Sequence, residues 1–179
     1  MSEPTVDAYF TQTIPELYRA AMTDTAAQDQ PELTVTYTIT GEQSGSYGLR
    51  MQGEQIAVVP GGIEPSDMYV ELTYAAWRDA ISHGMTEQFI DYARRRKIEI
   101  VKGLQGTVQM ELTHSDDSTS ESQVVFGGQT EPMLAIRMTA DDYAAMMRGD
   151  LNGNMAFMTG RLKFEGSLPL LMKLGGLSG

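Results

Sequence analysis

The stretch that decides the fold is TADDYAAMMRGDLNGNMAFMTGRLKFEGSLPLLMKL, residues 139–174. It opens with a threonine, whose side chain can accept hydrogen bonds from the free N–H groups of a first helical turn. Gly149 can end that helix, because glycine readily adopts the left-handed conformation of a helix terminus. A helical segment at Met155–Thr159, a strand at Arg161–Glu165 and an apolar helix at Leu168–Leu174 follow. This order predicts a mixed α and β structure.

The rest of the chain supplies more strands and helices. Strands are predicted where β-branched and aromatic residues alternate with polar ones. Apolar residues at helical spacing predict an opening helix that includes Phe10, Ile14 and Leu17, and Thr73 and Thr86 can cap two further helices. The fold class is therefore α+β, an antiparallel sheet covered by helices. The predicted strands are Glu32–Thr40, Tyr47–Met51, Gln55–Val59, Met68–Leu72, Lys97–Val101, Thr107–Thr113, Gln123–Phe126 and Met133–Met138, with SDDSTSES as a polar loop.

The two halves of the sequence repeat one another. Thr73 aligns with Thr139 at an offset of 139 − 73 = 66 residues, and Gly103 aligns with Gly166. Each half reads as strand, capped helix, glycine, second helix, basic residue, strand and glycine, which indicates an imperfect tandem duplication. The expected units are residues 1–104, without a closing helix, and residues 105–179, without an opening helix, packed together.

Composition excludes several classes of function. The net charge of −11, from 13 Lys and Arg against 24 Asp and Glu, opposes binding to nucleic acid and steady attachment to anionic lipid. The chain has no cysteine, and its two histidines, His83 and His114, have no second ligand or nucleophile spaced to them. No phosphate-binding glycine motif is present. We therefore expect no enzyme activity, no cofactor and no metal.

Location follows from the apolar segments. The N-terminus MSEPTVDAYF lacks a basic region followed by an apolar run, so no signal peptide is expected. No apolar run reaches the roughly 18 residues of a membrane-spanning helix. The default expectation is a cytoplasmic, acidic protein without stable membrane insertion, and a homo-oligomer is compatible with the sequence.

The order of residues in 139–174 resembles the closing segment of the sterol carrier protein type 2 family. That segment has a Ser or Thr cap, an acidic pair, a short Asn-containing turn, an Ala-Phe-x-x-Gly segment, a basic and apolar strand, and a closing amphipathic helix. The first half, with TYTITGEQSGSYGLRM as a first hairpin, resembles the family's opening. The matching residues are Thr139, Asp141, Asp142, Gly149, Asn152, Ala156, Phe157, Gly160, Arg161 to Phe164, Gly166 and Leu168 to Leu174.

The resemblance implies an apolar tunnel between sheet and helices that holds acyl chains or sterols. The chain is then a non-catalytic binder or carrier of fatty-acyl, acyl-CoA, sterol-like or other apolar lipid ligands. Its 13 methionines fit this reading, because flexible, polarizable side chains suit varied apolar ligands. The predicted ligand-binding residues are Met138, Met146, Met147, Phe157, Met158, Leu162, Phe164, Leu168, Leu171 and Met172.

Two alternatives stay open at this point. The same residues could form a filled core, which would make the chain a structural or protein-interaction module. The chain could also serve as an accessory domain of a lipid-handling enzyme system. Within the first copy, Arg94 and Arg95 stand where the second has Met158 and Thr159, and a charge is costly in an apolar tunnel. We therefore expect no independent lipid site in the first copy.

Overall fold

The computed structural model describes residues 4–23, 29–94 and 97–177. Its centre is one eight-stranded sheet with the order β3-β2-β1-β4-β6-β5-β7-β8. Neighbouring strands are antiparallel except for two parallel pairs, β1 with β4 and β5 with β7. The strands are β1 (Leu33–Thr40), β2 (Gly45–Gln52), β3 (Gln55–Pro60), β4 (Met68–Thr73), β5 (Gly106–Thr113), β6 (Thr119–Phe126), β7 (Met133–Thr139) and β8 (Lys163–Gly166).

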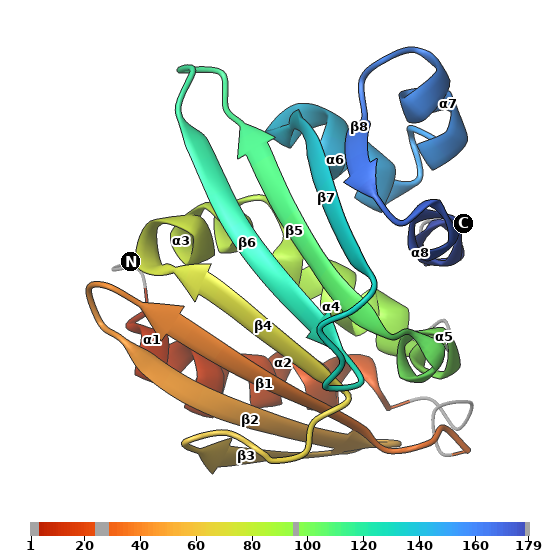
Figure 1. Ribbon diagram of the computed structural model, residues 1–179. Coiled ribbons are helices and arrows are strands. Elements are labelled where there is room, and N and C mark those ends of the chain that lie inside the picture. The colour runs from red at the N-terminus through yellow and green to blue at the C-terminus, as the bar shows by residue number, and fades with distance from the viewer. Residues whose placement is uncertain (1–3, 24–28, 95–96, 178–179) are drawn as a thin grey trace.

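The helices of the first half cover one face of this sheet, and those of the second half lie toward the β7–β8 end (Figure 1). The predicted α+β class is thus confirmed. None of the helices in the described part of the chain has the length and apolar content that a membrane crossing requires. The helices are α1 (Val6–Ala8), the π-helical η1 (Tyr9–Thr13), α2 (Ile14–Ala21), α3 (Tyr74–Ser82), α4 (Met85–Arg94), α5 (Ile98–Gly103), α6 (Ala140–Arg148), α7 (Gly153–Met158) and α8 (Leu168–Gly175).

The opening helix forms, but it does not start at Pro15: it runs without a break from α1 through the π-helical η1 into α2, and Pro15 follows directly after that π-helical turn. Its apolar side chains belong to the core of the sheet. Phe10 is completely buried, and its ring stacks on Tyr47 at a centroid distance of 4.7 Å and lies 5.1 Å from the ring of Tyr37. The Tyr18 hydroxyl donates to the backbone oxygen of Gly53 at 2.8 Å. The segment from α1 to α2 therefore fixes the β1–β2–β3 end of the sheet.

Both halves contain a hairpin, then a strand parallel to its first strand, then a threonine-capped helix. The Thr73 and Thr139 hydroxyls each accept a backbone N–H at 3.1 Å at the start of α3 and α6. In the parallel pairs Thr73 lies opposite Thr40, and Thr139 lies opposite Thr113. The two predicted caps are confirmed.

Beyond these caps the halves differ. The predicted strand Lys97–Val101 is wrong, because these residues begin helix α5, which buries Ile98 and Val101 three positions apart. The segment KIEIV fits both a strand period and a helix period, and burial of the helical pair decides. Gly103 ends a helix, whereas Gly166 ends strand β8, so their predicted equivalence is also wrong. A duplication of the complete unit is not confirmed.

Two smaller expectations are corrected. Thr86 lies inside α4 rather than capping it, and its buried hydroxyl forms a hydrogen bond with the hydroxyl of Tyr9. The polar loop predicted after Thr113 is shorter than expected, because β6 already begins at Thr119. The hairpin closes through the His114 N–H, which donates to the Ser118 oxygen at 2.8 Å. Backbone pairing with β5 holds these polar residues in a strand whose sides are partly exposed.

One carboxylate joins β1 to α5. The Asp67 carboxylate accepts hydrogen bonds from the Thr34 backbone N–H at 2.9 Å, the Thr34 hydroxyl at 3.0 Å and the Lys102 ammonium at 3.0 Å. Burial raises the pKa of Asp67, but these hydrogen bonds and the Lys102 charge outweigh burial and hold the pKa below its ordinary value. The ionised carboxylate therefore stabilises the folded state.

We expect Asp67→Asn to lower the free energy of unfolding at neutral pH by about 1.5–3 kcal/mol, because charged hydrogen bonds are lost. A depressed pKa contributes stability above the unfolded pKa, and that contribution disappears as the pH falls through the lower folded pKa. The gap between wild type and variant should therefore shrink below about pH 4. Urea unfolding at several pH values measures this difference in the free energy of unfolding. A gap that stays constant into strong acid would contradict this role of Asp67.

Candidate functional site

The predicted ligand-binding residues lie on β7, α6, α7, β8 and α8, with Leu162 directly before β8, and these elements adjoin one another at one end of the sheet (Figure 1). Local signals build each element. Gly149 ends α6 in the left-handed conformation with φ of +83°. The Asn152 side chain accepts the Asn154 N–H at 2.8 Å and begins α7. These turns reverse the chain twice and return it toward β7.

A tight corner sets α8 against the start of β7. Gly166 has φ of +106°, and a Cβ at this position would lie 2.3 Å from the Met133 backbone oxygen. The Ser167 N–H donates to that same oxygen at 2.9 Å, and the Ser167 hydroxyl accepts the Leu170 N–H at 3.2 Å as the cap of α8. Leu170 is buried on the inner side of the helix. The glycine thus permits the contact that positions α8.

The ten predicted residues occupy three different environments. Met138 and Leu162 are buried. Met146, Met147, Phe164 and Leu171 are half-buried, and all of these except Met147 pack against the main core. The remaining four are exposed: Phe157, Met158, Leu168 and Met172.

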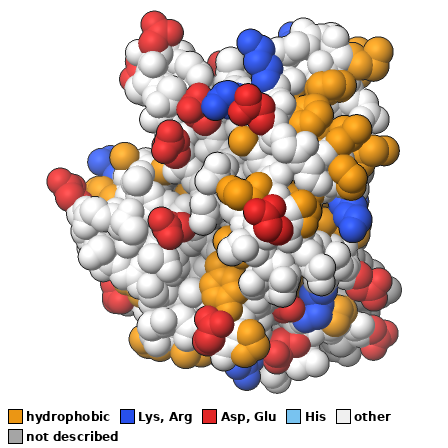
Figure 2. Space-filling model, in the orientation of Figure 1, with side chains coloured by type: hydrophobic (Ala, Val, Ile, Leu, Met, Phe, Trp, Pro, Cys, Tyr) orange, Lys and Arg blue, Asp and Glu red, His pale blue; other side chains and the backbone are white. Residues whose placement is uncertain are grey.

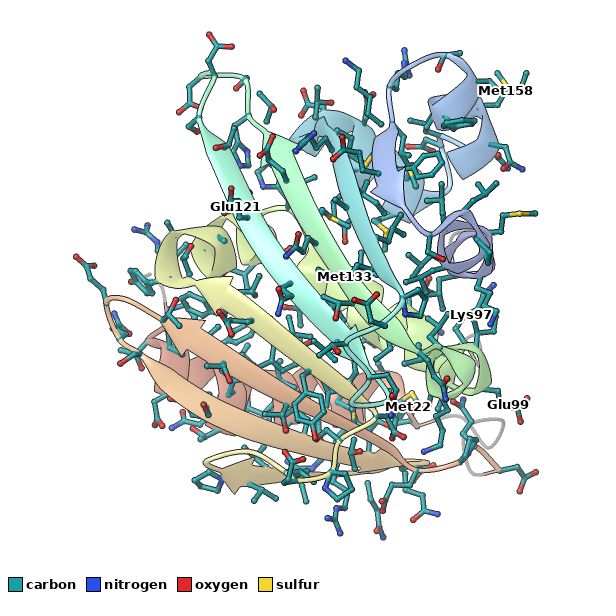
Figure 3. The ribbon with its side chains drawn as sticks, viewed as in Figure 1. Met22, Lys97, Glu99, Glu121, Met133 and Met158 are labelled. Atoms are coloured by element: carbon teal, nitrogen blue, oxygen red, sulfur yellow. The ribbon has the colours of Figure 1, made fainter. Side chains whose placement is uncertain are left out.

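Met158 differs most from the expectation of a tunnel wall. Its exposed fraction is 79%, and it projects from α7 away from the sheet (Figure 3). Phe157 is half exposed, yet its ring lies 5.4 Å from the ring of Phe164 on β8. The apolar set therefore forms a layer, with buried members beneath and exposed members outside.

A hollow lies elsewhere, on the sheet. It measures about 340 Å³ and is lined by mainly polar residues of β4, β5, β6 and β7, among them Glu71, Glu111, Glu121 and Arg137. The Arg137 guanidinium lies 3.8 Å from the Glu111 carboxylate. None of the ten predicted residues lines this hollow. Its polar walls do not suit an apolar ligand, and the tunnel between sheet and helices stays a prediction.

The structure brings together two histidines that the sequence left isolated. His114 Nε2 lies 3.3 Å from one Asp79 carboxylate oxygen, and His83 Nδ1 lies 3.5 Å from the other. The imidazole centroids are 6.4 Å apart. His114 and Asp79 are far apart in the sequence and meet because the β5–β6 turn reaches the end of α3. No sequence pattern indicates this contact.

This cluster lacks the arrangement of a catalytic triad. The Ser120 hydroxyl lies 2.9 Å from Nε2 of His114, the same nitrogen that faces Asp79. In a triad the nucleophile and the acid bind opposite nitrogens of the imidazole. Within residues 4–23, 29–94 and 97–177, no group of three or more His, Cys, Asp and Glu side chains is placed to hold a metal ion.

The basic run is only partly visible. Arg94 is exposed at the end of α4, and the Lys97 ammonium donates to the Gly176 oxygen at 2.7 Å. Arg95 and Arg96 lie outside the described residues. The contact of Lys97 ties α5 to the end of α8, which is a structural role. The expectation of no lipid site in the first half stays a prediction.

Comparison with known proteins gives a family match. Residues 90–178 match the model of the SCP-2 sterol transfer family. The chain is 41% identical over 58 residues to peroxisomal multifunctional enzyme A of Dictyostelium discoideum, covering 32% of this chain and 13% of that protein. It is 32% identical over 84 residues to hydroxysteroid dehydrogenase-like protein 2 of Bos taurus, covering 42% and 20%. The matched region is thus a small part of these relatives.

Two solved structures are also similar. The solution structure of sterol carrier protein domain 2 of Helicoverpa armigera is 19% identical with a TM-score of 0.42, covering 54% of this chain and 85% of that chain. The apo form of sterol carrier protein 2 from Yarrowia lipolytica is 12% identical with a TM-score of 0.27, covering 97% and 92%.

Proposed function

We propose that this chain, whose residues 90–178 belong to the SCP-2 sterol transfer family, binds and carries an apolar lipid ligand without transforming it. The family match is the observation that carries the proposal. It begins within α4, continues through α8 and includes all ten predicted ligand-binding residues. Fatty-acyl, acyl-CoA and sterol-like molecules are the ligand classes that we propose.

The layered apolar region supports this function. Half-buried Met146, Phe164 and Leu171 pack against the core beneath the exposed layer, and half-buried Met147 follows Met146 on α6. Methionine and leucine side chains can rearrange around an entering chain, and each CH₂ removed from water contributes about 0.8 kcal/mol. We propose that these four line the ligand, with buried Met138 and Leu162 beneath them. Phe157, Met158, Leu168 and Met172 then form the entrance, and α8 is the side that moves.

The proposed role is non-catalytic. The His83–Asp79–His114 cluster places both polar partners of His114 on one nitrogen, which does not activate a serine. It also lies at the turn of β5 and β6, away from the apolar layer on α6, α7 and α8. Binding by burial needs none of these polar groups.

We expect Leu171→Asp and Met147→Asp each to weaken uptake of a fluorescent fatty acid by at least about tenfold, because a carboxylate would be placed against the acyl chain. Fluorescence titration measures the affinity, and circular dichroism checks the fold of each variant. Leu17→Asp, an equivalent change at an exposed leucine on α2, is the matched control and should bind normally. Normal uptake by both folded site variants would place the ligand elsewhere.

A second candidate function has its own support. One of the two relatives described above is named as an enzyme and the other as a hydroxysteroid dehydrogenase-like protein, and the chain matches a fifth of their length or less. We propose as the alternative that the chain presents a lipid to a separate enzyme. Native mass spectrometry followed by lipid extraction would identify a ligand in either case. A cytoplasmic location stays part of the proposal, and fractionation tests it.

A further inference from the structure

Apolar side chains gather on the outer surface of α7 and α8. We define the outer patch as five exposed residues: Met155, Phe157, Met158, Leu168 and Met172. Figure 2 shows hydrophobic side chains grouped along the upper right border of the molecule, where Figure 1 places α7, β8 and α8. Contiguous exposed apolar surface of this kind marks an interaction site.

The helices present these residues in a regular way. Leu168 and Met172 lie one turn apart on α8, so their side chains share its outer face. Met155 and Met158 are three positions apart on α7 and also share a face, while Ala156 between them is completely buried. Each helix therefore has one side in the core and an apolar side outward.

The segment that carries the outer patch has a net charge opposite to that of the whole chain. Residues 151–177 contain Arg161, Lys163 and Lys173 against Glu165, a net charge of 3 − 1 = +2, whereas the whole chain carries −11. Arg161 is paired with Asp142 at 3.6 Å. Lys163 and Lys173 have no ion pair within the described residues, and Lys173 follows Met172 directly on α8. Lys173 thus accompanies the outer patch on α8, and Lys163 lies on β8, the strand between α7 and α8 in the sequence.

We propose that the outer patch docks on the surface of an anionic lipid bilayer. Methionine, leucine and phenylalanine would enter the headgroup boundary, while the lysines contact anionic headgroups, as in interfacial helices. The helices have six and eight residues and therefore lie on the surface instead of crossing it. The acidic charge on distant faces is screened beyond a Debye length of about 10 Å.

This inference rests on the proposed function, because the bilayer is the source from which an apolar ligand would be taken. The outer patch includes the proposed entrance residues, so docking would bring the entrance against the lipid. An acyl chain could then pass from the bilayer to the half-buried layer with little exposure to water. The transfer itself makes and breaks no covalent bond.

A second copy of the chain is a poorer occupant. In a two-fold dimer the same patch faces itself. Lys163 and Lys173 would then approach a patch of the same positive charge, and juxtaposed like charges disfavour association. Anionic lipid instead offers an apolar interior and negative headgroups together. Both properties of the outer patch match that one surface.

Co-sedimentation with vesicles tests the proposal. The wild type should bind vesicles of phosphatidylcholine mixed with phosphatidylserine, bind vesicles of phosphatidylcholine alone more weakly, and lose binding as salt is added. Met155→Asp should weaken binding at least about tenfold, since an exposed methionine no longer enters the lipid. Lys173→Gln should weaken binding about fivefold, as expected for one lysine near an anionic surface.

Matched controls separate docking from ligand binding and from folding. Leu17→Asp and Arg50→Gln make the same kinds of change at exposed positions outside the outer patch and should leave vesicle binding unchanged. Met155→Asp and Lys173→Gln should retain uptake of a fluorescent fatty acid offered in water. A wild type that docks but takes up no fatty acid would overturn the proposed function alone.

Three results would overturn the docking proposal. The first is equal binding of the wild type to neutral and anionic vesicles, and the second is no binding to either. The third is a dimer, seen by analytical ultracentrifugation, that Met155→Asp dissociates, because the outer patch would then join two copies. Met155 is 55% exposed, so its replacement should not unfold the chain. Lys173→Gln tests docking independently, because it removes a positive charge and leaves the apolar residues of the outer patch unchanged.

Discussion

Phe10→Ala should lower the free energy of unfolding by about 3–5 kcal/mol, among the largest effects of any single replacement in this chain. Phe10 is completely buried, and its ring contacts the rings of Tyr9, Tyr37 and Tyr47. Truncation would remove apolar burial and leave a cavity among aromatic rings that cannot close it. Urea unfolding measures the loss as a lower midpoint at an unchanged slope.

The same helical segment supplies the control. Leu17 on α2 is 41% exposed, so Leu17→Ala should cost less than about 1 kcal/mol. If Phe10→Ala were equally mild, the opening helix would not be part of the core. Loss of fatty-acid uptake in a still-folded Phe10→Ala protein would contradict the proposed ligand site, because Phe10 packs at the β1–β2 end of the sheet.

The sequence predicted those parts of the fold that depend on short-range signals. Thr73 and Thr139 cap their helices because the hydroxyl reaches an N–H three residues ahead, and Gly149 ends α6 because glycine tolerates a positive φ. The hairpin of β1 and β2 follows from strand composition on both sides of a glycine-rich turn. Each of these features involves residues within one turn or one hairpin.

Long-range contacts decided the features that sequence did not predict. Residues 97–101 suit either a strand or a helix, and only the burial of Ile98 and Val101 selects the helix. The order of strands in the sheet, in which β4 lies between β1 and β6, also has no local signal. The contact of Asp79 with His114 depends on that order, because the β5–β6 turn must pass the end of α3.

In the candidate site, too, some features follow from short-range signals and others from long-range contacts. Its residues could be grouped from sequence, because β7, α6, α7, β8 and α8 follow one another along the chain. Their exposure could not, because it depends on which side of a short helix meets the core. On α7 the buried residue is Ala156, which turns Met155 and Met158 outward. A methionine-rich segment therefore contains both proposed ligand contacts, such as Met146, and exposed residues of the proposed docking surface.

Gly103 and Gly166, which were predicted from the sequence to be equivalent, should respond in opposite ways to replacement by alanine. Gly166→Ala should lower the free energy of unfolding by about 3 kcal/mol, because φ is +106° and the new Cβ would lie 2.3 Å from the Met133 carbonyl oxygen. That oxygen also accepts the Ser167 N–H, so the corner leading to α8 would have to open.

Gly103 is the matched control for this replacement. It ends helix α5, and a Cβ there would meet nothing within 4 Å. Gly103→Ala should therefore be neutral or stabilise the chain by about 0.5–1 kcal/mol, since alanine restricts the unfolded chain more than glycine does. Urea unfolding of the two variants side by side measures the difference. The structure places Gly103 at the end of helix α5 and Gly166 at the end of strand β8, so only the replacement of Gly166 should destabilise the chain. Equal destabilisation by both replacements would contradict this difference and support the predicted equivalence of the two glycines.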